Sequence, residues 1–65
     1  MKDARGIELQ EGDAIIRIES MNYGVTEGFY LRDDETRQNC AVMFNPKTNR
    51  ENVAYSRHTY KVPKV

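Results

Sequence analysis

The chain has 65 residues, enough for one small domain, since a chain of this length buries only about 60% of the surface that its unfolded form exposes. Its 38% hydrophobic and 31% charged residues are typical of a globular protein and exclude a disordered chain. Ten basic and ten acidic residues give a formal net charge of zero. The single Cys and single His exclude an internal disulfide and cannot complete a four-ligand zinc site, so we expect no metal and no cofactor.

The longest apolar run covers only residues 40–44, whereas a helix needs roughly 20 apolar residues to span a bilayer. No apolar segment follows the charged start of the chain, as it would in a secretory signal. We therefore expect a soluble, cytoplasmic protein that does not bind membranes. The initial Met1 and the lack of a tag lead us to expect a complete reading frame of the accessory or phage type. We expect a single domain over 1–65, with a core at about 7–62 and short flexible termini.

A turn at Gly12-Asp13 opens the first predicted strand, because glycine adopts positive φ readily and an aspartate side chain can accept hydrogen bonds from nearby backbone N–H groups. The strand covers residues 14–20. Its side chains alternate between two faces, with Ala14, Ile16 and Ile18 on one and Ile15, Arg17 and Glu19 on the other. This period of two, in a run rich in β-branched residues, indicates a half-buried strand.

A second strand is predicted over residues 26–32. In this strand we expect Phe29 and Leu31 to face the core and Tyr30 and Arg32 to face solvent. A glycine at position 28 indicates a bulge or a sharp bend. The acidic residues 33–35 end the strand, and residues 36–39 are typical of a polar turn.

Residues 34–45 are compatible with two structures. Start and stop signals permit a helix from Glu35 to Asn45, capped by Asp34 and ended by Pro46. The apolar residues, however, fall consecutively at 40–44 without a helical stripe, which favours a short strand buried on both sides. We therefore expect a strand.

The sequence Asn-Pro-Lys-Thr-Asn at 45–49 predicts a tight turn between antiparallel strands, because proline presets φ and asparagine tolerates left-handed conformations. The return strand covers residues 51–55, with Val53 and Tyr55 on one face.

A 3₁₀ turn over residues 56–58 is expected to lead into the last strand, 59–62. This strand presents Tyr60 and Val62 and ends before Pro63, which cannot donate to a sheet. The chain therefore contains five short strands with turns every 8 to 12 residues or so, a spacing that favours a sandwich or a barrel.

At this length a closed barrel leaves the fewest exposed edges. The order of features also resembles the SH3-like small barrels, especially KOW and Tudor-type modules. It is carried by the turn at 12–13, the strand start Ala14-Ile15-Ile16, the loop with glycines at 24–28, and the 56–58 link into Tyr60-Lys61-Val62. This resemblance is one of topology and spans about residues 7–62. We predict an all-β fold, a single small SH3-like five-stranded antiparallel barrel.

Catalytic and metal-binding patterns are weak. Cys40 and His58 are the one Cys/His pair that nucleophilic catalysis could use, but Cys40 opens an apolar run and is more typical of a buried core residue. Asp33, Asp34 and Glu35 are consecutive and match no Ca²⁺-binding spacing, so we expect a solvated turn. An enzyme with Cys40 as its nucleophile is therefore only the third of three hypotheses.

The charges are unevenly spread along the chain. Residues 1–35 hold nine acidic and four basic side chains, whereas residues 36–65 hold one acidic and six basic ones. If the fold gathers the distal loop and the last strand on one side, basic and aromatic groups form a surface suited to nucleic acid: Lys47, Arg50, Arg57, Tyr60 and Lys61. If the fold mixes the two halves, the acidic side chains neutralise the basic ones.

We predict a non-enzymatic binding module. The first hypothesis is contact with RNA or DNA through the basic and aromatic C-terminal half, as the resemblance to KOW modules implies. The second is a protein-interaction or inhibitor module that acts on a larger host protein. Its candidate contact residues are aromatic and acidic: Tyr23, Tyr30, Asp33, Asp34 and Glu35. The resemblance to Tudor-type barrels also implies an aromatic cage for methylated cations.

Overall fold

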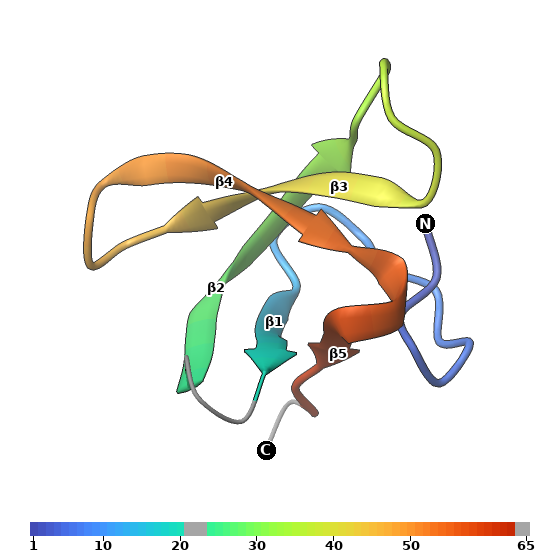
Figure 1. Cartoon of the computed structure of the whole chain (residues 1–65), viewed down its shortest axis with the longest axis horizontal. Helices are drawn as coiled ribbons and strands as arrows, with labels where there is room; N and C mark the ends of the chain where they lie inside the picture. Colours follow the sequence, from blue (N-terminus) through green and yellow to red (C-terminus); the bar gives the residue numbers. More distant parts are fainter. Residues whose placement is uncertain (21–23, 64–65) are drawn as a thin grey trace.

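The computed structural model describes residues 1–20 and 24–63 (Figure 1). In these residues the elements follow in the order β1 (Ala14–Ser20), β2 (Gly24–Asp33), β3 (Cys40–Asn45), β4 (Arg50–Tyr55), the 3₁₀ turn η1 (Ser56–His58) and β5 (Thr59–Lys61). The predicted all-β fold of five antiparallel strands and the predicted 3₁₀ turn are confirmed. The alternative helix over 35–45 is wrong, since β3 occupies its second half. No helix in the described ranges is long and apolar enough to cross a membrane.

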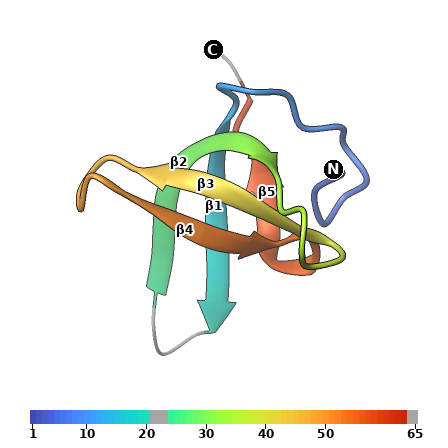
Figure 2. The same cartoon turned by 90° about the horizontal axis from the view of Figure 1, so that it is seen from above.

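The strands pair in the order β4-β3-β2-β1-β5, and every neighbouring pair is antiparallel. β4 and β5 form the two edges, and in the described part of the chain no ladder joins them. The pairing therefore leaves the sheet open, without the closure that a barrel requires. Figure 2 shows the β3–β4 hairpin crossing over β1 and β2.

β2 is shared by the two parts of the sheet. Residues 24–29 pair with β1, and residues 29–33 pair with β3. Gly28 lies where the partner changes: a Cβ atom there would lie 2.5 Å from Cε of Met43 and closer still to the carbonyl oxygen of Phe44. Glycine is thus required for the close approach of β2 to β3. The register shift in this pairing comes later than the bulge predicted at Gly28, between Tyr30 and Arg32.

The core consists of buried apolar side chains from the N-terminal segment and from four strands: Leu9, Ile15, Tyr30, Ala41, Met43 and Ala54. The predicted orientation of β2 is wrong. Tyr30 is 6% exposed and Phe29 42%, so β2 turns Tyr30 toward the core. Tyr30 stands opposite Met43 in the β2–β3 ladder, and directly opposed residues share a face of a sheet. In β1, for which no orientation was predicted, Ile15 is buried and Ile18 lies on the exposed face.

The predicted turn at Gly12-Asp13 is confirmed. Gly12 has a φ of 89°, and the Asp13 carboxylate accepts a hydrogen bond from the backbone N–H of Gln10 at 2.8 Å. Two backbone hydrogen bonds join this turn to β2, because the N–H of Gly12 donates to the carbonyl of Tyr30 and the N–H of Tyr30 donates to that of Asp13. The turn thus places the start of β1 against the middle of β2.

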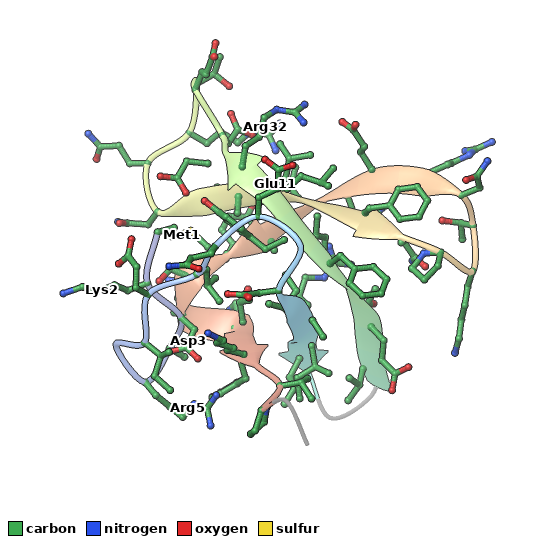
Figure 3. All side chains as sticks on the ribbon, turned by 180° about the vertical axis from the view of Figure 1, so that it is seen from behind. Met1, Lys2, Asp3, Arg5, Glu11 and Arg32 are labelled. Atoms are coloured by element: carbon green, nitrogen blue, oxygen red, sulfur yellow. The ribbon has the colours of Figure 1, made fainter. Side chains whose placement is uncertain are left out.

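The start of the chain is packed against the rest of the fold. Met1 packs against the core, and Asp3 is 3% exposed. The Asp3 carboxylate accepts hydrogen bonds from the backbone N–H groups of Arg5 (2.8 Å), Ile7 (2.9 Å) and Lys61 (2.9 Å), and from the Arg5 guanidinium (3.1 Å). Figure 3 shows Asp3 and Arg5 beside β5. The packed region therefore begins before residue 7.

Asp3 stays ionised in this site. Burial by itself raises the pKa of a carboxyl group, but the hydrogen bonds from Lys61, Ile7 and Arg5 outweigh burial and lower the pKa of Asp3 to about 2. Its carboxylate accordingly ties the N-terminal segment to β5.

We expect Asp3→Asn to lower the free energy of unfolding at pH 7 by about 2 kcal/mol, because a carboxyl group whose pKa falls from 3.8 to about 2 on folding stabilises the folded state by that order. The stabilisation that comes from this lowered pKa is fully present above pH 3.8 and is lost as the pH falls toward 2. The difference between the variant and the wild type should thus shrink between about pH 4 and pH 2 in urea denaturation. Glu35→Gln, at an exposed position, is the matched control. A difference independent of pH would contradict this role of Asp3.

Gly28→Ala is expected to destabilise the protein by about 1–3 kcal/mol, because the added methyl group must displace the backbone of Phe44. Urea denaturation measures the loss. Glu27→Ala, at the neighbouring exposed position of β2, is the control and should change stability far less. Equal stability of Gly28→Ala and the wild type would argue against the close approach of β2 to β3.

Candidate interaction surface

Lys47 and Arg50 lie at the tip of the β3–β4 hairpin, where the predicted turn is confirmed. The side-chain oxygen of Asn45 accepts a hydrogen bond from the backbone N–H of Lys47 at 3.0 Å, and Asn49 has a φ of 57°. Both basic residues are exposed, and within the described residues neither forms an ion pair. The tip therefore presents two free cations to solvent.

The other three residues predicted to bind nucleic acid lie beyond the opposite end of β4. Arg57 is in η1, and Tyr60 and Lys61 are in β5. The six residues of β4 span about 20 Å, so they keep Lys47 and Arg50 apart from Arg57. In both Figure 1 and Figure 2 the hairpin tip and β5 lie on different sides of the molecule. The fold brings these residues together as two groups rather than one surface.

Tyr60 and Lys61 are already engaged by the N-terminal segment. The ammonium group of Lys61 lies 3.3 Å from Oδ2 of Asp13, whose side chain is 7% exposed. The guanidinium carbon of Arg5 lies 5.7 Å from the centroid of the Tyr60 ring, within the range of a cation–π contact. The ion pair between Lys61 and Asp13 agrees with the alternative given above, in which acidic side chains of the first half of the chain neutralise basic ones of the second half.

The aromatic and acidic residues of the second hypothesis do not form one exposed surface. Tyr30 is buried, and its hydroxyl group donates a hydrogen bond to Asp33. Burial and this bond raise the pKa of Tyr30 above its ordinary value, while the same bond and the amino group of Met1, 3.1 Å away, lower the pKa of Asp33. Tyr30 therefore serves the core, and its predicted outward position is wrong. Tyr23 lies outside the described residues.

Asp34 and Glu35 occupy the β2–β3 loop. The Asp34 carboxylate accepts hydrogen bonds of 2.8 Å from both the backbone N–H and the hydroxyl group of Thr36, and these bonds lower the pKa of Asp34. In the described ranges no three His, Cys, Asp or Glu side chains gather closely enough to hold a metal ion. The loop is thus held by its own hydrogen bonds.

Cys40 and His58 occupy different surroundings. Cys40 is 4% exposed and lies in β3. His58 accepts a hydrogen bond from Nε of Arg57 at 3.3 Å, and its ring meets the Tyr55 ring edge to face with centroids 6.4 Å apart. The environment of the Cys40 thiol is that of a core residue.

A surface that was not predicted lies on the outer side of the β1–β2 hairpin. The ladder sets Ile18 opposite Val25, Ile16 opposite Glu27 and Ala14 opposite Phe29, so these six side chains share one face. Large apolar groups remain in solvent there, with Val25 53%, Phe29 42% and Ile18 39% exposed. Val62, whose N–H donates to the carbonyl of Ala14, is 37% exposed beside them. We call the apolar members of this set, Ala14, Ile16, Ile18, Val25, Phe29 and Val62, the outer apolar face.

A groove runs into this face. It has a volume of about 300 Å³ and is lined by Ala14, Ile15, Ile16, Glu27, Gly28, Phe29, Pro46 and Val62. Glu27 is the charged residue in this lining. Two other hollows, of about 500 Å³ and 380 Å³, lie around η1 and the β2–β3 loop and are more polar than this groove. The first is lined in part by Asp3, whose carboxylate is already occupied by hydrogen bonds.

The sequence carries one signal for the outer apolar face. Both faces of β1 hold isoleucine, and when one is buried in the core the other must meet solvent or a partner. Alternation alone does not tell which of the two faces is inside. The register with β2 decides it, because Gly28 lies opposite Ile15 on the core side.

No protein-family model matches the chain, and comparisons with curated proteins and with solved structures give no match either.

Proposed function

We propose that this protein is a non-enzymatic binding module that binds a protein partner through the outer apolar face. The observation that carries the proposal is the exposure of several large apolar side chains on one face: Ile18, Val25, Phe29 and Val62. Apolar surface left in water costs about 25 cal/mol per Å², and an apolar patch rimmed by polar groups is typical of an interaction site. A protein surface of complementary shape would cover this face.

The order of the elements supports an SH3-like arrangement for this module. A leading turn, two long strands, a tight hairpin, a 3₁₀ turn and a short last strand follow one another as in that class of small β folds. The likeness to KOW modules favours nucleic acid as a partner, which is the second candidate function. Its support in this molecule is the pair of free cations at the hairpin tip, Lys47 and Arg50.

Val25→Asp should abolish capture of a protein partner, because it places a charge at the most exposed apolar side chain of the outer apolar face. Val25 is 53% exposed, so the variant should keep its fold, with a change in unfolding free energy within about 1 kcal/mol. Wild type and variant are immobilised and exposed to lysate of the source cells, with and without nuclease treatment. A stoichiometric captured protein is then purified and titrated against both by calorimetry.

The matched control is the double variant Lys47→Glu/Arg50→Glu, which alters the hairpin tip and leaves the outer apolar face intact. It should bind the purified partner as the wild type does. Equal binding by Val25→Asp and the wild type would overturn the proposal. Capture that disappears with nuclease, or only in the double variant, would favour nucleic acid.

Salt dependence separates the two possible nucleic-acid surfaces. If only Lys47 and Arg50 contact phosphates, the logarithm of the binding constant for a duplex oligonucleotide should fall with the logarithm of salt concentration at a slope of about −1.8. If Arg57 and Lys61 contributed as well, the slope would be about −3.6. Because β4 separates these groups and Asp13 pairs with Lys61, we expect weak binding with the shallower slope, measured by fluorescence anisotropy. The steeper slope would contradict this arrangement of the cations.

A further inference from the structure

The first half of β2 has one open edge. Tyr30 exchanges its backbone hydrogen bonds with Gly12 and Asp13, on the side of β1. Backbone groups of successive residues point to opposite sides of a strand, so Thr26 and Gly28 also face β1, whereas Val25 and Glu27 face away from it. On that far side β3 reaches only as far as Phe29 in the pairing. In the described part of the chain, no strand pairs with this edge.

The open edge borders the groove in the outer apolar face. Figure 1 shows the first half of β2, at lower left, with β1 on one side and no strand on the other. The groove beside it is lined mainly by apolar groups, among them Ile16, Phe29, Pro46 and Val62. An unpaired strand edge is a template for an added strand, and an adjacent pocket selects its side chains.

Glu27 determines which charge a bound segment must carry beside the groove. Its side chain is exposed on the same face as Phe29 and lines the groove. Among the described residues, its carboxylate forms no ion pair or hydrogen bond. A carboxylate beside an apolar groove is complementary to a basic side chain that follows or precedes an apolar one.

We propose that the partner is an extended peptide segment that adds as a strand to the edge of β2 at Val25 and Glu27. One of its apolar side chains enters the groove, and a neighbouring Lys or Arg pairs with Glu27. This inference rests on the proposed protein-binding function and specifies the chemistry of the segment that the partner presents.

Selection from a phage-displayed library of random 12-residue peptides tests this specificity. Wild-type protein should enrich peptides in which Lys or Arg stands within two positions of a large apolar residue. Glu27→Lys should enrich Asp or Glu at that place instead. Glu35→Lys carries the same charge change on the β2–β3 loop and should select the same peptides as the wild type.

The mode of binding is tested with N-methylated versions of a selected peptide. Two versions of the peptide are compared, one methylated on the odd-numbered and one on the even-numbered backbone nitrogens. The set that faces the edge of β2 should weaken binding at least tenfold when methylated, and the set that faces away should weaken it little. Equal effects of both versions would overturn strand addition. Selected peptides with no basic preference, or the same preference with Glu27→Lys, would overturn the role of Glu27.

Failure to enrich any peptide would overturn the extended-segment inference. The proposed function itself would then still be decided by the Val25→Asp capture experiment, because a folded partner surface can cover the outer apolar face without adding a strand. The two experiments thus fail independently.

Discussion

The close approach of Gly28 in β2 to Phe44 in β3 is the constraint on which the rest of the structure depends. Because Gly28 has no side chain, β2 can change its partner from β1 to β3 at this point and carry the β3–β4 hairpin across β1. The crossing brings Tyr30 and Met43 into the core beside Ile15. It also leaves the first half of β2 with a free edge, next to a groove.

The opposite charges of the two halves of the chain meet at the other side of the molecule. Asp13 pairs with Lys61, and Asp3 accepts a hydrogen bond from the backbone of Lys61. These buried carboxylates hold the start of the chain against β5, where the short last strand alone would supply few hydrogen bonds. At β5 the ion pair between Asp13 and Lys61 therefore joins the acidic and basic halves of the chain, while the cations of the hairpin tip remain in solvent.

Local patterns were enough to predict the strands, because turn residues such as Gly12 and Asn49 and the apolar run at 40–44 act over a few neighbours. They were not enough to orient the strands. Both Phe29 and Tyr30 are apolar enough for a core, and only the pairing of Tyr30 with Met43 decides between them. The candidate site was missed for the same reason, since the exposure of Val25 and Phe29 depends on register between distant residues. The capture of Lys61 by Asp13, 48 positions away, is equally invisible to a local pattern.

Amide hydrogen exchange at Val25 and Glu27, followed by NMR, tests most directly the claim that β2 presents an open binding edge. In the free protein these two amides should exchange rapidly, while those of Thr26 and Gly28 are protected by their pairing with β1. Addition of a selected peptide should protect Val25 and Glu27 and leave the hairpin tip at Lys47 unchanged. Amides of Val25 and Glu27 that are as protected as those of Thr26 and Gly28 in the free protein would contradict the account.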